Sequence, residues 1–175
     1  MWPNKKERED YEICEFIRHY NTILLGHRVE LVEMCDNPDA FVKDVLSKEI
    51  FGVELTSVYL DNKSVPGLHM NNEQTEIKDE IEKIDLYKKR IIKSVLAKKE
   101  KASQYNKRYS LILSIYVNEY VSIFMDKTVW YSFVNKNQNV FENISPFIDI
   151  VFWPLGNDSV FSMKYGMRDK SKKRL

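Results

Sequence analysis

Two short segments decide the fold that we expect for this chain: Asn37-Pro38-Asp39-Ala40-Phe41-Val42 and Phe51-Gly52-Val53-Glu54-Leu55-Thr56-Ser57. A hairpin turn centred at Leu46-Ser47 would pair Asp39 with Glu54, because the two residues lie equally far from that centre. Facing side chains of an antiparallel pair have Cβ atoms about 4.5–5.5 Å apart. The pattern therefore predicts two neighbouring carboxylates on one face of the hairpin. The opposite face would be apolar and carries Ala40, Val42, Phe51, Val53 and Leu55.

Two carboxylates at this spacing need a partner of positive charge or a proton. Like charges repel unless a cation lies between them or one carboxyl group stays protonated. Oxygen donors at an open site are the ligands that Mg²⁺ and Mn²⁺ prefer, so Asp39 and Glu54 are candidate metal ligands. Two structural explanations stay open. Asp39 after Pro38 could cap a turn, and Glu54 could pair with a lysine or arginine in the core.

The rest of the sequence predicts helices and strands in an order typical of an α/β fold. Three consecutive strands favour an antiparallel meander, and the strands on either side of a long helix can run parallel through a right-handed crossover. The apolar run 111–115 suits a central strand that is covered on both faces. The expected helices are 7–21, 76–105 and 126–135, and the expected strands are 29–34, 39–45, 50–59, 108–117, 147–153 and 159–165, with a loop at 61–72.

These elements form one domain in the arrangement that we expect. An α/β domain with a mixed central sheet would cover residues 1–167, because the pattern shows no internal repeat and no second core. A basic, flexible tail would follow at 168–175.

Pro38-Asp39 followed by Glu54-Leu55-Thr56, set within this order of elements, resembles the PD-(D/E)xK nuclease superfamily. The resemblance covers roughly residues 7–117. It implies an α-β-β-β-α-β restriction-endonuclease-like core, to which this chain adds a C-terminal helix and strands. It also implies Mg²⁺ or Mn²⁺ as cofactor, nucleic acid as partner, and Asp39 and Glu54 as metal ligands.

The chain departs from the family at one position, because Thr56 stands where the family has a lysine. Some members take this lysine from a neighbouring element. Lys88 and Lys98 both fall on the apolar stripe of the long helix, and Lys98 is our candidate together with Thr56. Lysines at such positions also occur as apolar stems whose charged ends reach solvent, so this alternative stays open.

The family frequently adds a glutamate on its first helix. Glu9 fits this role best, because it lies four residues before Ile13 and shares the buried stripe of the expected helix. Glu12 lies at the edge of that stripe, and Glu15 points away from it.

Composition places the chain among soluble globular proteins. Its 175 residues are 43% hydrophobic and 30% charged, a mixture that excludes wholesale disorder. No apolar run approaches the ~20 residues of a membrane span, and no secretory signal is expected at the start. Two cysteines do not make a disulfide framework. We therefore expect a cytoplasmic protein that does not contact a membrane.

The net charge of +1 conceals a strongly basic segment. Residues 86–108 contain nine basic side chains and one acidic one, Glu100. Such a segment can bind the phosphate backbone of nucleic acid. It follows an acidic segment, and acidic-to-basic order along a helix is also what the helix dipole favours without any ligand.

Two functions from different classes follow from these observations. The first is a metal-dependent nuclease, or a nuclease-related DNA-processing protein, that cleaves phosphodiester bonds. The alternative is a catalytically inactive protein of the nuclease fold that serves as a protein or nucleic-acid interaction module. We also expect a homodimer or another partner contact, because aromatic residues gather in the C-terminal third and surplus aromatics mark interfaces. These residues include Trp130, Tyr131, Phe133, Phe152 and Trp153.

Overall fold

The chain folds around a seven-stranded mixed sheet that has helices on both faces. The computed structural model describes residues 4–59, 80–105, 107–117, 125–155 and 159–168. The strands are β1 (Val29–Met34), β2 (Ala40–Asp44), β3 (Ile50–Val58), β4 (Ser110–Val117), β5 (Phe147–Leu155), β6 (Ser159–Ser162) and β7 (Gly166–Arg168). The helices are α1 (Lys5–Ile23), α2 (Glu80–Ala102), α4 (Lys127–Lys136) and α5 (Gln138–Phe141). The α/β class and the mixed sheet are confirmed.

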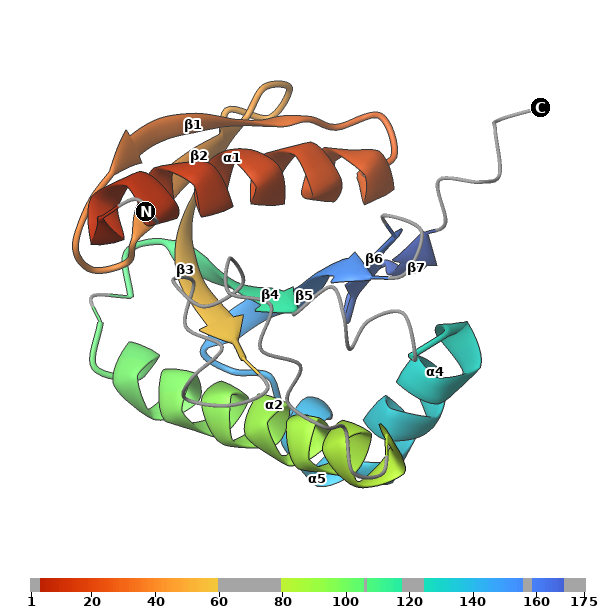
Figure 1. Cartoon of the computed structure of the whole chain (residues 1–175). Coiled ribbons are helices and arrows are strands. Elements are labelled where there is room, and N and C mark those ends of the chain that lie inside the picture. The colour runs from red at the N-terminus through yellow and green to blue at the C-terminus, as the bar shows by residue number, and fades with distance from the viewer. Residues whose placement is uncertain (1–3, 60–79, 106, 118–124, 156–158, 169–175) are drawn as a thin grey trace.

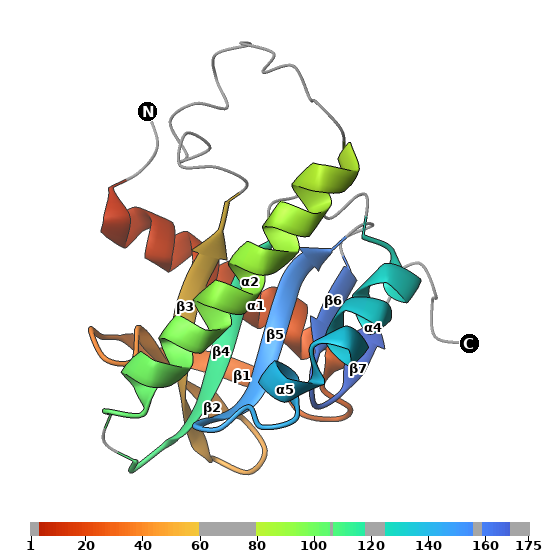
Figure 2. The same cartoon turned by 90° about the horizontal axis from the view of Figure 1, so that it is seen from below.

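The strands lie across the sheet in chain order, from β1 to β7. β1, β2 and β3 pair antiparallel, β3, β4 and β5 pair parallel, and β6 and β7 add antiparallel at the far edge. α1 covers one face of the sheet, whereas α2 and α4 cover the other (Figures 1 and 2). β3 therefore lies between α1 on one side and α2 on the other.

β4 is the central strand and is buried on both faces, as its apolar sequence predicts. Leu111, Leu113 and Ile115 face α2 and belong to a core that contains Tyr87, Ile91 and Val95 of that helix. Ile112 faces the other way and packs in a second core with Ile13 and Phe16 of α1. Each face of the sheet therefore has its own helix and its own core.

The hairpin of β2 and β3 has the register that the sequence predicts. Ala40 pairs with Val53 and Lys43 with Ile50, so the turn is centred at Leu46-Ser47. The apolar face of the hairpin packs against α1, with Ala40, Val42, Val53 and Leu55 in the core and Phe51 against it. Continuing the ladder by one residue brings Asp39 opposite Glu54.

Gly52 allows the segment before β2 to lie directly on β3. A Cβ atom at Gly52 would lie 2.6 Å from Cγ of Pro38 and 2.7 Å from Cδ2 of Leu111, well inside van der Waals contact. Any side chain here would displace Pro38, and with it the neighbouring Asp39. The glycine is therefore part of what positions this carboxylate.

The structure differs from the expected elements mainly near the C-terminus. The last expected strand, 159–165, is shorter in the structure: β6 ends at Ser162 and a turn occupies residues 163–165. Neither β7 nor the short helix α5 was anticipated. The expected loop at 61–72, the first residues of the expected long helix at 76–79 and the tail at 169–175 lie outside the described residues. None of the described helices is long and apolar enough to span a membrane.

The reason given for an aromatic interface was wrong. The rings of Trp130, Phe133, Phe152 and Trp153 are buried inside this chain, none of them more than 4% exposed. Trp130, Phe133 and Phe152 share one core, in which the rings of Trp130 and Phe152 have centroids 5.2 Å apart. Trp153 packs in the other core, against His19 of α1. The core absorbs these aromatics, so they do not indicate a partner surface. A homodimer stays a prediction without this support.

Candidate functional site

A polar cavity of about 300 Å³ opens beside the C-terminal half of β3. Side chains from α1, the segment before β2, β3 and α2 meet there, although they are far apart in the sequence. We call it the carboxylate cavity. Its lining consists of Lys5, Arg8, Glu9, Glu12, Asp39, Leu55, Thr56, Ser57, Tyr59, Lys98 and Lys101. Four of the five candidate residues of the sequence therefore reach one cavity, and the fifth, Glu54, bonds to two lysines of its lining.

Asp39 is held against β3 by a backbone hydrogen bond. The N–H of Leu55 donates to Oδ2 of Asp39 at 2.7 Å. This bond fixes the carboxylate at the cavity wall, one residue along the strand from Glu54. This bond reaches across to the neighbouring strand, so it is not the turn cap that the sequence left open.

Glu54 is a fully buried carboxylate, 0% exposed, that is surrounded by donors from the end of α2. Its Oε1 atom accepts from Nζ of Lys98 at 2.8 Å and from Nζ of Lys101 at 3.0 Å. Its Oε2 atom accepts from the hydroxyl of Tyr105 at 3.0 Å. A buried carboxylate is expensive unless it is paired. These three donors provide the pairing, so the alternative of a core ion pair is borne out by the geometry.

Lys98 also donates to the carbonyl oxygen of Leu55, at 2.8 Å. Its ammonium group therefore lies between the Glu54 carboxylate and the backbone of β3. The side chain is 21% exposed, so most of the group is removed from solvent. Of the two lysines weighed from the sequence, Lys88 and Lys98, it is Lys98 that reaches this site.

Lys101 and Tyr105 were missed by sequence reasoning as partners of Glu54. A signal was present, because Lys98, Lys101 and Tyr105 are spaced by three and four residues and such positions share one side of a helix. Tyr105 follows the end of α2 in a turn in which its N–H donates to the carbonyl of Ala102. The three side chains therefore approach Glu54 from one direction.

Two glutamates of α1 line the cavity, and Glu12 is the more deeply placed. Glu12 is 5% exposed and its Oε1 atom accepts from the hydroxyl of Ser57 on β3 at 2.5 Å. Glu9 is ion-paired with Lys5 at 3.4 Å and lies nearer to solvent. The placement of Glu12 at the edge of the stripe was therefore wrong: α1 begins at Lys5 and turns Glu12 inward beside Ile13.

Burial and neighbouring charge set the pKa values of the cavity acids in opposite directions. Burial, and then the charge of Glu54, raise the pKa of Asp39 above its ordinary value, although the bond from Leu55 and the charge of Lys98 act against this. Burial likewise raises the pKa of Glu12. For Glu54, burial alone would raise the pKa, but Lys98 and Lys101 outweigh it and hold the pKa below its ordinary value. Glu54 is therefore ionised, and Asp39 and Glu12 bind protons more readily than free carboxyls.

The donor atoms at this site are of the kind that a divalent metal prefers. Oε1 of Glu54 and the carbonyl of Leu55 converge on the Lys98 ammonium, which is a cation already seated between oxygens. Asp39 lies close enough for Lys98 and Glu54 to shift its pKa. Within the described ranges, no group of three or more His, Cys, Asp or Glu is arranged as a ready metal site. A metal would therefore compete with Lys98 for these oxygens.

Two other residues weighed from the sequence lie elsewhere. Lys88, the second lysine of the helical stripe, lines a different cavity between α2 and α4, where Asp85 lies 3.6 Å from its Nζ. It does not line the carboxylate cavity, because it is ten residues from Lys98 and nearer the start of α2. Glu15 pairs with Arg18 on α1, as a residue that points away from the site should.

Comparison of the chain with models of protein families, with curated proteins and with solved structures found no match. We therefore infer function from the geometry of the carboxylate cavity and from the topology that builds it.

Proposed function

We propose that this protein is a metal-dependent nuclease of the PD-(D/E)xK type, with its active site at the carboxylate cavity. One observation carries the proposal. Asp39, Lys98 and the buried Glu54 that Lys98 pairs with meet at this cavity, although they come from the segment before β2, from α2 and from β3. A lysine beside two acids is the combination of the family motif, in which the second acid and the lysine come from one strand. Here Lys98 comes from α2, while Thr56 occupies the motif position on β3 and lines the same cavity.

The topology supports the same proposal. α1 precedes an antiparallel meander, α2 crosses from β3 to β4, and β3 and β4 are parallel. This is the α-β-β-β-α-β order that the sequence resemblance implies. β5, β6 and β7 extend the sheet beyond that core, as the proposed C-terminal addition requires.

Each residue of the cavity would have a separate role in binding or catalysis. Asp39, Glu54 and the Leu55 carbonyl would hold Mg²⁺ or Mn²⁺, and the bound ion would supply a Lewis acid that polarises the phosphodiester. Lys98 would keep positive charge beside the phosphate, in the role of the motif lysine. Lys5, Arg8 and Lys101, which line the cavity, would bind neighbouring phosphates of the nucleic acid. Glu9 and Glu12 would orient water at the α1 side.

A cleavage panel tests this proposal. Linear and plasmid DNA, single-stranded DNA and RNA are incubated with the protein and either Mg²⁺ or Mn²⁺. We expect cleavage that EDTA abolishes and that disappears in both Asp39→Ala and Glu54→Ala, because each removes a negatively charged ligand of the ion. Thr56→Ala should retain most of the activity, since a neutral hydroxyl contributes little at a charged phosphate. Cleavage that persists in EDTA or in the Asp39 variant would exclude the mechanism.

One observation favours the alternative of an inactive interaction module. Oε1 of Glu54 accepts from two lysines of α2 and Oε2 accepts from Tyr105 just beyond that helix, so the charge of this carboxylate is neutralised within the chain. In that case no substrate would be cut and Mn²⁺ would not bind, while DNA or a protein partner would bind without it. Metal titration in parallel with the cleavage panel separates the two functions.

A further inference from the structure

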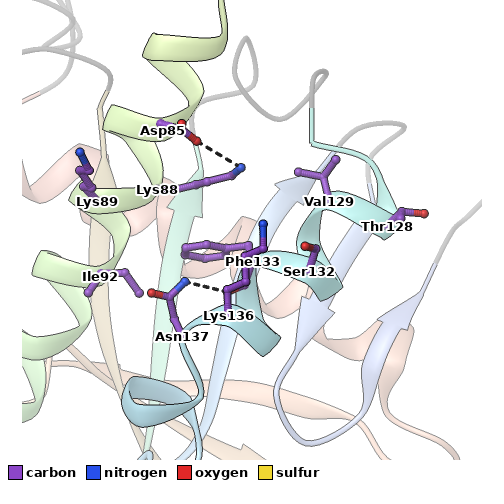
Figure 3. A pocket seen from close by; sticks show the side chains of 10 residues that line it. All are labelled: Asp85, Lys88, Lys89, Ile92, Thr128, Val129, Ser132, Phe133, Lys136 and Asn137. Carbon is purple, nitrogen blue, oxygen red and sulfur yellow. Dashed lines mark hydrogen bonds and ion pairs between the residues drawn. The ribbon is translucent and has the colours of Figure 1, made fainter.

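A second, larger cavity lies between α2 and α4, on the face of the sheet opposite α1 (Figures 1 and 3). Its volume is about 610 Å³, within the range of about 300–1,000 Å³ that is usual for small-molecule sites. None of the residues that line it belongs to the lining of the carboxylate cavity. The nuclease proposal therefore does not account for it.

The lining of this interhelical cavity carries surplus positive charge. Three lysines, Lys88, Lys89 and Lys136, face one acid, Asp85, among the described residues of the lining. Figure 3 shows Lys88 of α2 and Lys136 of α4 extending into the space between the two helices, whereas Lys89 is turned away. Asp85 lies 3.6 Å from Nζ of Lys88, and its side chain is 64% exposed. It offsets at most one of the two positive charges that face the cavity, so a surplus of about one remains there, and Lys89 adds a further charge at the margin of the lining.

Two like charges that face each other from separate helices are unfavourable unless an anion lies between them. Lys88 stands on an otherwise apolar stripe of α2, where an aliphatic residue would pack without this cost. The hydroxyls of Thr128 and Ser132 lie in the same lining and can donate to an oxyanion. The polar part of the cavity therefore matches an anion with several acceptor oxygens.

The remainder of the lining is apolar. Ile92 comes from α2, and Val129 and Phe133 come from α4. In Figure 3 the Phe133 ring lies between the two helices, near the ends of the lysine side chains. Small-molecule sites commonly combine such an apolar wall with a few polar groups that fix orientation. An occupant should therefore carry a flat or apolar group next to its anionic end.

We propose that the interhelical cavity binds a small phosphomonoester that carries a ring, of the size of a mononucleotide. A phosphomonoester has a charge of about −1.5 to −2 at neutral pH. Lys88 and Lys136 within the cavity, with Lys89 at its margin, supply positive charge to pair with it. Its phosphate lies between Lys88 and Lys136 and accepts from Ser132 or Thr128. Its ring packs against Ile92, Val129 and Phe133.

Calorimetric titration of the full chain with adenosine 5′-monophosphate tests this site. EDTA is present throughout, and the Asp39→Asn variant is titrated as well, so that the carboxylate cavity cannot account for the signal. We expect saturable binding that is unchanged in Asp39→Asn. Adenosine and inorganic phosphate, each titrated alone, should bind at least about tenfold more weakly, because each lacks half of the contacts.

Variants locate the binding. Lys88→Met and Lys136→Met should each weaken it about tenfold or more, since each removes a charge-assisted hydrogen bond but keeps the stem volume. Lys93→Met is the matched control, because Lys93 lies exposed on the same helix outside the lining. Circular dichroism establishes that each variant is folded. Equal weakening in all three variants would show non-specific charge attraction and would overturn the proposed site. So would the absence of nucleotide binding, or inorganic phosphate that binds as tightly as the nucleotide.

Discussion

At the scale of single residues, the Glu54 carboxylate explains why the end of α2 lies where it does. A fully buried carboxylate must be paired, and its three donors all come from residues 98–105. The same ammonium that stabilises Glu54 lies beside the cavity in which chemistry is proposed. Lys98 therefore has a structural role and a proposed catalytic one, and the two can be separated by experiment.

Lys98→Met should change metal binding and catalysis in opposite directions. Without the ammonium, Oε1 of Glu54 and the Leu55 carbonyl lose a competing cation, so Mn²⁺ affinity should rise. Cleavage should fall by about 10²–10³-fold, because positive charge beside the phosphate is lost. Calorimetric Mn²⁺ titration and the cleavage assay measure the two effects, with Lys93→Met as the control on the same helix. A folded variant with weaker metal binding would contradict the competition between Lys98 and the ion.

Gly52→Ala should destabilise the protein although it adds a single methyl group. The new Cβ would meet Pro38 and Leu111 at 2.6 and 2.7 Å, and the proline ring cannot rotate out of the way. Overpacking of this kind costs about 1–3 kcal/mol. Urea unfolding gives the change, and Gly26→Ala is a useful comparison: Gly26 has open space around it but a φ of +75°, so its cost is conformational rather than steric. An unchanged urea midpoint in Gly52→Ala would show that Pro38 is free to move.

At the scale of elements, the hairpin of β2 and β3 could be predicted because its two ends constrain each other. The symmetric placement of Asp39 and Glu54 about Leu46-Ser47, together with the apolar opposite face, is compatible with a single strand register. The structure has this register. The turn contains no glycine. Asp44 stabilises it instead, because its Oδ1 atom accepts from the N–H groups of Leu46 and Ser47 at 2.8 and 2.7 Å. This local cap was not evident from the sequence pattern.

Asp44→Ala should weaken the hairpin by about 1 kcal/mol. The two cap bonds and the contact of Oδ2 with Nδ1 of His27 at 2.9 Å are lost, but Leu46 is 69% exposed, so water can replace part of the bonding and the cost stays at the low end of the usual range. Asp44→Asn keeps an acceptor oxygen and should lose less. Unfolding in urea at neutral pH compares the two variants. A larger loss in the asparagine variant than in the alanine variant would show that charge, not the cap, is what matters here.

The elements that sequence reasoning missed depend on contacts between distant segments. Periodicity gives α1, α2 and β4 because each buries a regular stripe or run. It cannot show that Glu12 meets Ser57, since that bond joins α1 to the far end of β3. The burial of Trp130 and Phe152 could not be predicted either, because it depends on the packing of α4 against β5. On the hairpin the site could be predicted, and so could Glu9 of α1 and Lys98 of α2, but the bonds made by Glu12, Lys101 and Tyr105 could not.

At the scale of the whole molecule, Asp149 links parts of the fold that lie far from the carboxylate cavity. It is 0% exposed on β5, and its Oδ2 atom accepts from the hydroxyls of Ser162 on β6 and Tyr20 on α1. Its Oδ1 atom accepts from the N–H of Lys164 at 3.1 Å. Burial nevertheless raises the pKa of Asp149 above its ordinary value, although these bonds act against it. The far edge of the sheet is therefore joined to α1 through an acid that is costly to ionise.

The stability of the fold should consequently respond to pH with opposite signs at Asp149 and Asp44. Asp149 holds its proton to higher pH in the folded chain than in the unfolded chain, so its contribution to the free energy of unfolding is lost as pH rises through its folded pKa. The pKa of Asp44 is lowered, first by the bond from the N–H of Ser47, so its contribution is present above the unfolded pKa and lost as pH falls. When the pH is raised from about 3 to about 7, the free energy of unfolding of Asp149→Asn should therefore increase relative to that of the unmodified chain. That of Asp44→Asn should decrease relative to the unmodified chain over the same range. Urea unfolding of the three proteins at both pH values measures the two differences. A change of the same sign in both variants would show that net charge, rather than these two local environments, governs the response.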